Sequence, residues 1–244
     1  VKIYIKTMDR KEKIAALKEC IRTLEDEEES EYVNCFGHEA FEKYGFSEYE
    51  FIKKLKESGG VLAGSFVLNE CMYRNDLKIF EAKGMDIFFH YENKGVEIMI
   101  EFLKEKGYNL ITNYTNVHSV TSYSKDKSFV EIICVKKEPI EHIFEADLDC
   151  CRIYYNLDDN KIYSKKGWMM NYNTKFNIGL ETCNTINCAK INRLKKYIDR
   201  GFYIYIEGKK INDLIEFLYF YTHKYPYADS FNVYEGFCLY LQKL

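Results

Sequence analysis

The stretch from Gly59 to Phe89 constrains the fold of this chain most. It reads as a short apolar strand, Val61–Ala63, then the pair Gly64-Ser65 and an apolar helix, and after a polar insert a second strand, Met85–Phe89. A glycine-serine turn at a helix start offers backbone N–H groups and a hydroxyl, which suit a phosphate. The one carboxylate in the second strand, Asp86, is costly to bury unless it is paired, metal-bound or beside a cleft. Together these features predict phosphoryl or nucleotidyl transfer.

Helical and strand patterns alternate along the rest of the chain. This alternation predicts an α/β (α+β) fold, with a mixed sheet flanked by helices and helical extensions at both ends. We expect an N-terminal arm and helix over 1–46, a core over 47–166 and a mostly helical C-terminal part over 167–244. The expected helices lie at 9–29, 47–57, 66–72, 94–106, 138–144, 188–199, 211–222 and 233–241. The expected strands after the opening stretch lie at 109–114, 117–123, 129–135, 146–155, 161–164 and 202–206.

Composition removes several classes of protein. The net charge of −3 argues against a generally basic nucleic-acid binder, although a local basic groove is still allowed. The nine cysteines include no CxxC pair, which favours reduced thiols over a disulfide or zinc framework. No apolar run reaches transmembrane length and the N-terminus lacks the shape of a signal peptide, so we expect no membrane partner and a cytoplasmic location.

Several further acids lie in strand-like or apolar surroundings. Asp147 and Asp149 fall on one face of the strand expected over 146–155, because side chains at i and i+2 of a strand share a face. Two such carboxylates suit a divalent ion, although a solvent-facing pair at a sheet edge has the same pattern. Glu131, within FVEIICV, is another acid in an apolar strand.

At this point the sequence resembles a known family. Ala63-Gly64-Ser65, followed by an apolar strand with an acid, is similar to the nucleotidyltransferase superfamily of the DNA polymerase beta type. The similarity is greatest to a branch found in giant DNA viruses and some fungi, which reads DIDIF at the second motif. That branch continues with a segment like FDFDFC-K-x-YY and a helix reading R-x-x-K-Y-x-x-R-G-F, which Ala146–Tyr155 and Arg193–Phe202 match here. The resemblance extends from about Phe51 to Ile206.

The resemblance implies an activity and a set of roles. The family transfers a nucleoside monophosphate from a nucleoside triphosphate to a hydroxyl, which here would belong to a protein, an RNA or a small molecule. Gly64 and Ser65 would bind the β- and γ-phosphates. Asp86 and Asp147 would be the catalytic carboxylates and would bind Mg²⁺ or Mn²⁺, with Asp149 as a further metal ligand. Glu131 stands where the family tends to carry Gln.

The sequence also departs from the family pattern. Aligning GMDIFF on DIDIFF places Gly84 where the first acid belongs, and only Asp86 remains. Asp76 or Glu81, on the polar insert, could fold back and substitute. The alternative is a catalytically degenerate fold, a pseudoenzyme that serves as a binding or structural protein of a virus particle or virus factory in the host cytoplasm. That alternative needs no metal ion.

For two motifs a purely structural role is an alternative to the functional one. Gly64-Ser65 is also an ordinary helix start, since serine is a favoured cap. Arg193, Lys196 and Arg200 fall on one side of the helix expected over 188–199 and its end, where they could bind phosphate or RNA. Basic residues near a helix C-terminus also stabilise its carbonyl groups. The oligomeric state is left open by the sequence.

Overall fold

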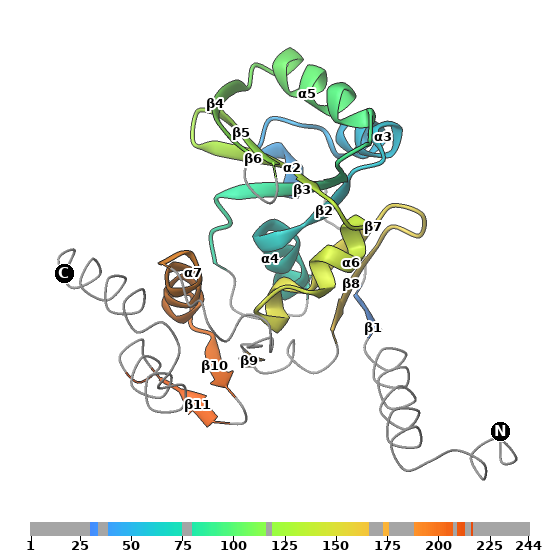
Figure 1. Cartoon of the computed structure of the whole chain (residues 1–244). Coiled ribbons are helices and arrows are strands. Elements are labelled where there is room, and N and C mark those ends of the chain that lie inside the picture. Colours follow the sequence, from blue (N-terminus) through green and yellow to red (C-terminus); the bar gives the residue numbers. More distant parts are fainter. Residues whose placement is uncertain are drawn as a thin grey trace, which may run out of the picture.

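In a computed structural model, residues 30–33, 39–74, 80–115, 119–165, 173–175, 188–206, 209–212 and 216 are described. They form an eight-stranded sheet with helices on both faces and a separate three-stranded sheet (Figure 1). The prediction of a mixed sheet flanked by helices is therefore confirmed. Within the described residues, no helix combines the length and the apolar character needed to cross a bilayer.

The large sheet has the strand order β1-β8-β7-β2-β3-β6-β5-β4. Its neighbouring strands are antiparallel except for β3 and β6, which are parallel. A parallel pair needs a long crossover, which here contains α5 (Gly95–Glu105) and the hairpin β4–β5. The strands are β1 (Ser30–Val33), β2 (Val61–Ala63), β3 (Gly84–His90), β4 (Asn109–Thr115), β5 (Ser119–Lys125), β6 (Ser128–Val135), β7 (Ile153–Asn156) and β8 (Lys161–Lys165).

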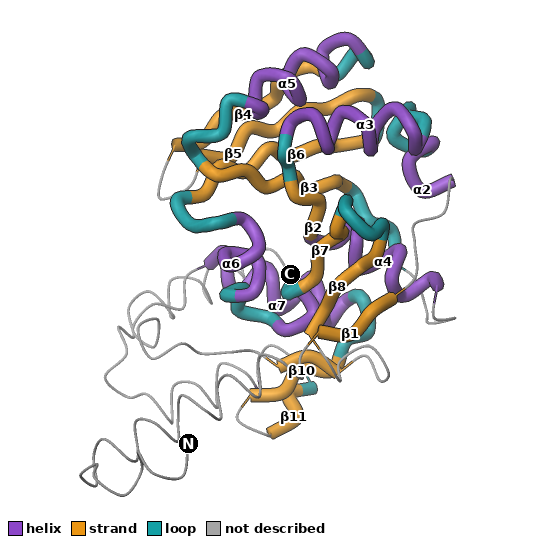
Figure 2. The backbone as a smooth tube through the Cα atoms, turned by 90° about the vertical axis from the view of Figure 1, so that its right-hand side faces the viewer, coloured by secondary structure: helices purple, strands orange, loops and turns teal. Residues whose placement is uncertain are grey.

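The two faces of β3 have different surroundings. Met85, Ile87 and Phe89 point into the main core, which α3 (Glu48–Ser58) and α5 cover together (Figure 2). Phe88 points to the other face, where it packs near α6 (Pro139–Phe144) in a smaller apolar cluster. Strand alternation places Asp86 on this second face. The acid is thus kept out of the main core by the period of its own strand.

Most of the predicted elements are confirmed with shifts of one or two residues at their ends. The helix α3 begins after Ser47, whose hydroxyl accepts the backbone N–H of Glu50 at 3.3 Å, as a capping residue should. The remaining helices are α2 (Glu39–Glu42), α4 (Gly64–Arg74) and α7 (Cys188–Asp199). The helices predicted over 9–29 and 233–241, and most of 211–222, lie outside the described residues.

The predicted strand over 146–155 is wrong in its first half. The structure has a bend at Asp147 and a 3-10 turn, η2 (Asp149–Cys151), before β7 begins at Ile153. In this turn Cys150 is fully buried and its backbone N–H donates to the hydroxyl of Thr174 at 3.1 Å. The backbone of Cys150 is therefore bonded to a side chain distant in sequence and not to a neighbouring strand. Asp147 and Asp149 consequently do not share a strand face.

The C-terminal part described here contains strands as well as a helix. β10 (Tyr203–Ile206) lies between β9 (Asn173–Lys175) and β11 (Lys209–Ile211) in the three-stranded sheet. The buried face of α7 continues the main core through Ile191, Leu194 and Tyr197. Since the rings of Phe80 and Phe202 meet with centroids 6.3 Å apart, the segment before β3 is also fixed against this part. The packing holds α7 near the face of the large sheet that bears Asp86.

Candidate functional site

Two carboxylates lie side by side on the open face of the large sheet. Asp86 on β3 and Glu131 on β6 are direct neighbours in the parallel register. On the next strand, Ser122 is the register partner of Glu131, and its hydroxyl donates to the Glu131 carboxylate at 3.1 Å. All three side chains line the same pocket, which has a volume of about 730 Å³. Three adjacent strands thus contribute one polar side chain each to a single surface.

The start of α4 lies against Asp86. Gly64 has a φ of +73°, and a Cβ atom at this position would lie 1.8 Å from Oδ2 of Asp86. The Ser65 backbone N–H donates to the Asp86 carboxylate, and the Ser65 side chain lines the pocket. The structure therefore brings together Gly64, Ser65 and Asp86. Only glycine combines this backbone conformation with so close an approach of a carboxylate.

The pKa of Asp86 is raised by some of its neighbours and lowered by others. Burial raises its pKa to about 7, the neighbouring negative charge of Glu131 acts in the same direction, and Lys196, Arg193 and the Ser65 N–H oppose the shift. A like-charged pair of carboxylates is unfavourable when both are ionised. A divalent cation removes that repulsion and takes carboxylate oxygens as ligands, so the pair fits Mg²⁺ or Mn²⁺.

This balance predicts a pH dependence of folding stability. The folded-state pKa of Asp86, about 7, lies above its ordinary value of 3.8, so the folded protein holds this proton more tightly. The free energy of unfolding should therefore fall by about 1.4 kcal/mol for each pH unit as the pH rises from about 4 to about 7. Above about pH 7 it should no longer change with the titration of Asp86. Urea unfolding of the wild type and Asp86→Asn at pH 5 and pH 8 measures this. An equal pH dependence in both proteins would contradict the assignment.

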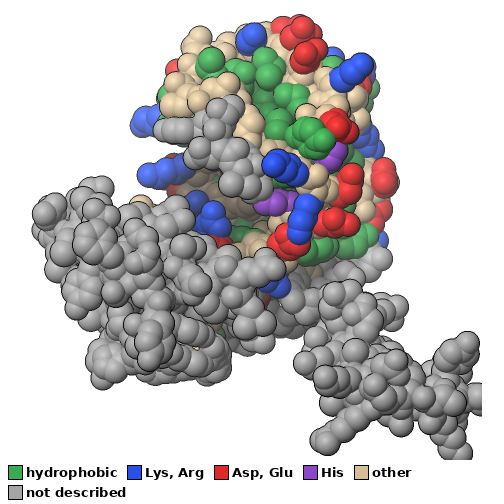
Figure 3. Space-filling model, viewed as in Figure 1, with side chains coloured by type: hydrophobic (Ala, Val, Ile, Leu, Met, Phe, Trp, Pro, Cys, Tyr) green, Lys and Arg blue, Asp and Glu red, His purple; other side chains and the backbone are tan. Residues whose placement is uncertain are grey.

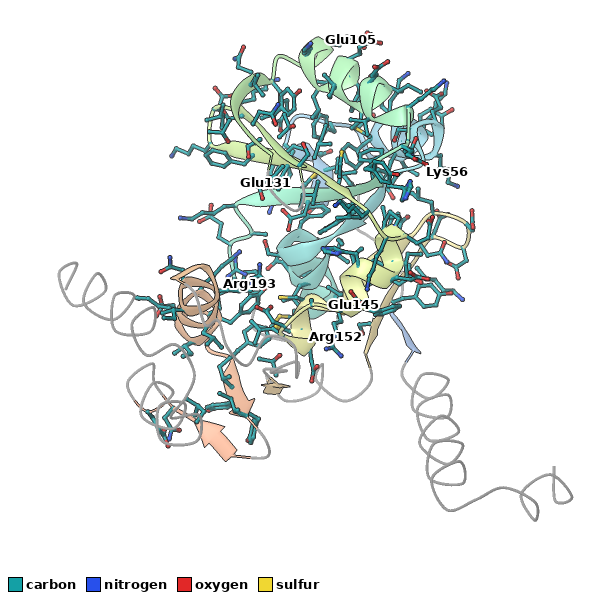
Figure 4. The ribbon with its side chains drawn as sticks, viewed as in Figure 1. Lys56, Glu105, Glu131, Glu145, Arg152 and Arg193 are labelled. Atoms are coloured by element: carbon teal, nitrogen blue, oxygen red, sulfur yellow. The ribbon has the colours of Figure 1, made fainter. Side chains whose placement is uncertain are left out.

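The opposite wall of the pocket is cationic. It is formed by the end of α7 and the residues beside it, which contribute Lys195, Lys196 and Arg200, with Lys83 from the segment before β3. Lys195 is engaged by Asp199 at 2.8 Å. Figure 4 shows Glu131 on the sheet and Arg193 on the helix α7 below it. Because Lys195, Lys196 and Arg200 come from a distant part of the chain, the packing of α7 brings them to the site, whereas Lys83 directly precedes β3.

Arg200 is the most constrained of these cations. Its guanidinium lies 3.9 Å from the ring centroid of Phe80 and 5.2 Å from that of Tyr197. Its Nη1 atom is buried and has no hydrogen-bond acceptor among the described residues. A buried donor without an acceptor is costly. Arg200 also lines the pocket, and guanidinium groups bind phosphate well.

The other predicted metal ligands lie elsewhere. Asp147 forms an ion pair with Arg193 at 2.7 Å, and Asp149 lies 3.7 Å from Arg152. Neither acid lines the pocket. In this structure Arg193 occupies the carboxylate of Asp147. The roles of Asp147 and Asp149 as metal ligands stay predictions.

One candidate substitute for the missing first acid lines the pocket, but among the described residues it does not join Asp86 and Glu131 in a metal-binding group. Gly84 lines the pocket beside Asp86, as the alignment with the family implies, and Glu81 from the polar insert lines it too. Asp76 lies outside the described residues. Among the described residues, no group of three or more His, Cys, Asp or Glu side chains is placed to hold a metal ion. The described carboxylate site is therefore a pair.

Sequence reasoning missed part of the pocket. Ser122, Ile111 and Phe129 line it on the side of β4 to β6, and the exposed fractions of Ile111 and Phe129 are 47% and 39%. Ile111 lies where the β4–β5 register shifts between Leu110 and Thr112, and local sequence patterns do not encode such an irregularity. On the face in Figure 3, acidic and basic side chains are interspersed, and no single-sign patch covers the described part of it.

Comparison with known proteins finds no matching family and no matching curated protein. Among solved structures, the chain is similar to one described as a tRNA-processing enzyme in an apo form, with a TM-score of 0.44 and 12% identity over 71% of this chain and 46% of that one. It is also similar to a tRNA nucleotidyltransferase complexed with a primer tRNA and an incoming ATP analogue, with a TM-score of 0.42 and 14% identity over 63% and 46%. The chain spans less than half the length of either structure. Likeness at this level assigns no activity to the chain.

Proposed function

We propose that the pocket binds a nucleoside triphosphate with a divalent ion and transfers a nucleoside monophosphate to a hydroxyl acceptor. The observation that carries the proposal is the in-register pair Asp86 and Glu131, which faces Lys196 and Arg200 across one pocket. Nucleotidyl transfer needs little covalent chemistry. It needs carboxylates that hold a divalent ion and cations that hold phosphates, on opposite sides of the reacting group.

The chain's own residues divide between the two tasks. Asp86 and Glu131 would hold Mg²⁺ or Mn²⁺, which supplies a Lewis acid at the phosphate oxygens when bound. Mg²⁺ commonly takes only one or two carboxylates, together with substrate phosphates and water, so a pair is a sufficient set. Ser65 at the start of α4, with Lys196 and Arg200, binds the phosphates.

The geometry also suggests where the acceptor lies. The attacking and leaving oxygens of a phosphoryl transfer lie roughly in line on opposite sides of the phosphorus. If the leaving pyrophosphate lies at the start of α4 and beside α7, the acceptor hydroxyl lies over β4 to β6. Glu131 is the carboxylate on that side and, hydrogen-bonded by Ser122, is positioned to accept the hydroxyl proton. RNA, protein and small-molecule hydroxyls are the acceptor classes to be tested.

The test is direct. The full chain is incubated with α-labelled ATP, CTP, GTP or UTP, with Mg²⁺ or Mn²⁺, and with each acceptor class in turn, while metal-dependent nucleotide binding is measured by calorimetry. Glu131→Gln should abolish label transfer, whereas Glu141→Gln, on the exposed surface of α6, should leave it unchanged. Absence of metal-dependent nucleotide binding by the wild type would overturn the proposal.

A second function is favoured by one specific observation. The position of the first acid is occupied by Gly84, and the remaining acid, Asp86, already accepts the Ser65 N–H at the start of α4. A protein that binds the nucleotide without transferring it would have the same arrangement. Binding by the wild type without label transfer to any acceptor would select this second function.

Restoring the missing acid separates the two functions. Gly84→Asp adds a carboxylate beside the pocket, and its Cβ would meet the backbone oxygen of Phe129 at 3.3 Å, a tight contact that a small shift relieves. We expect about tenfold tighter Mn²⁺ binding in the presence of ATP, from the extra carboxylate ligand. Calorimetry measures it, with Gly84→Asn as the uncharged control. Equal or weaker binding by Gly84→Asp would contradict the placement of the metal.

A further inference from the structure

Two adjacent thiols lie at the base of α7, in the turn η2. Cys150 is fully buried, whereas Cys151 is partly exposed. Their side chains hydrogen-bond to one another. The backbone N–H of Cys150 is fixed by the Thr174 hydroxyl at 3.1 Å. The arrangement holds two sulfur atoms together at a position that the proposed transfer reaction does not use.

Cys151 connects this turn to the cationic wall of the pocket. Its thiol donates to the hydroxyl of Tyr197 on α7 at a distance of 3.3 Å. Tyr197 is buried and stands next to Lys196, and its ring supports Arg200. A second polar contact between α7 and this region is the ion pair of Arg193 with Asp147. The sulfur of Cys151 therefore contacts directly the residue that supports Arg200.

Adjacent cysteines can form a disulfide only with rearrangement. Consecutive Cα atoms are about 3.8 Å apart across a trans peptide bond. Disulfides usually join Cα atoms that are roughly 4.4–6.8 Å apart, and departures from that range store strain and make the bond more easily reduced. A Cys150–Cys151 disulfide would therefore change the conformation of η2, and thiols would reverse it readily.

We propose that Cys150 and Cys151 form a reversible oxidation site that takes a hydroperoxide as its oxidant. The Cys151 thiolate attacks the peroxide oxygen, the O–O bond breaks, and one water leaves after proton transfer, which gives a sulfenic acid at Cys151. The sulfur of Cys150 then attacks that of Cys151, the S–O bond breaks, and a second molecule of water leaves. The two thiols lose two electrons and two protons, and hydrogen peroxide is reduced to two molecules of water.

Oxidation has a structural consequence at α7. The sulfur of Cys151 becomes bonded to Cys150, so it no longer donates a hydrogen to the hydroxyl of Tyr197. The turn that supports α7 changes shape at the same step. The helix should then open more readily, and the cations that it places in the pocket should be held less firmly. The effect on the pocket rests on the proposed function, whereas the oxidation site and the loosening of α7 do not.

The experiment uses the full chain. After treatment with hydrogen peroxide and alkylation of the free thiols, peptide mass analysis should find Cys150 and Cys151 joined within one peptide, and dithiothreitol should reverse this. Amide hydrogen exchange over 188–199 should become about tenfold faster in the oxidised wild type. Cys134→Ser, which changes a thiol on β6, should behave like the wild type. Cys151→Ser, which cannot form the disulfide, should show no change in exchange on peroxide treatment.

Three results would overturn the inference. They are alkylation of both thiols after peroxide treatment, irreversible oxidation of Cys151 to a sulfinic acid without a disulfide, and a disulfide that leaves exchange over 188–199 unchanged. None of these measurements involves a nucleotide. Calorimetry with ATP and Mn²⁺ is a separate measurement, in which oxidation should weaken binding. Failure of the wild type to bind ATP would overturn the proposed function and leave the thiol result standing.

Discussion

Asp86→Asn should lower the rate of nucleotidyl transfer by about 1,000-fold or more, while making the protein more stable at pH 8. The substitution removes one of the two carboxylates that would hold the divalent ion, and the loss of several kcal/mol of charge stabilisation corresponds to such a factor. The same substitution removes the cost of burying a carboxylate and its repulsion by Glu131, which together raise the pKa of Asp86. The amide oxygen of the substituted side chain can still accept the Ser65 N–H. Function and stability should therefore change in opposite directions.

Label transfer and urea unfolding measure the two effects on the same preparations. Asp158→Asn is the matched control, because Asp158 is an acid in the β7–β8 turn and lies outside the pocket. It should change neither the rate nor the stability at pH 8. Label transfer that survives Asp86→Asn would show that the ion is held elsewhere. A loss of stability at pH 8 would show that the carboxylate is favourable in the fold.

Gly95→Ala should destabilise the fold by about 3 kcal/mol or more, since overpacking against a rigid backbone has no cheap relief. A Cβ at Gly95 would lie 1.9 Å from the backbone oxygen of Ser58, at the end of α3. The approach is fixed by Asn93, whose side chain donates to Ser58 O at 3.2 Å and accepts the Gly95 N–H at 2.7 Å. The two helices that cover the main core therefore meet where only a glycine fits.

Urea unfolding of Gly95→Ala and Gly107→Ala distinguishes the destabilisation caused by a steric clash from that caused by a left-handed backbone conformation. Gly107 has a φ of +82°, but a Cβ there would meet nothing nearer than the Lys125 side chain at 3.8 Å among the described residues. Gly107→Ala should cost only about 1 kcal/mol, the usual penalty for the left-handed conformation. A loss for Gly95→Ala no larger than that for Gly107→Ala would contradict the predicted contact between α3 and α5.

Local sequence patterns determined the parts of this protein that depend on near neighbours. The cap at Ser47 specified where α3 begins, because its hydroxyl bonds to an N–H only three residues on. The strand, turn, helix and strand from Val61 to Phe89 were readable for the same reason. The alternation of β3 then placed Asp86 on the face opposite the main core. The resemblance to a family came from the same short-range motifs.

Contacts between distant segments decided the composition of the site. Glu131 stands beside Asp86 because β3 and β6 pair in parallel, and Ser122 joins them through the register of β5. No local pattern specifies which strands pair, since pairing depends on the energy of the whole sheet. Glu131 therefore looked like one strand acid among several.

Tertiary contacts also overrode the local pattern at Asp147 and Asp149. The alternation over 146–155 is that of a strand, yet the hydrogen bond from Cys150 N–H to Thr174 and the full burial of Leu148 and Cys150 hold η2 as a turn. Asp147 is then paired with Arg193 on α7, and the same helix and its end place Lys196 and Arg200 in the pocket. The sequence by itself determined the elements and the face of Asp86. Only the packing of α7 on the sheet decided which charges meet there, because those charges come from segments far apart in the chain.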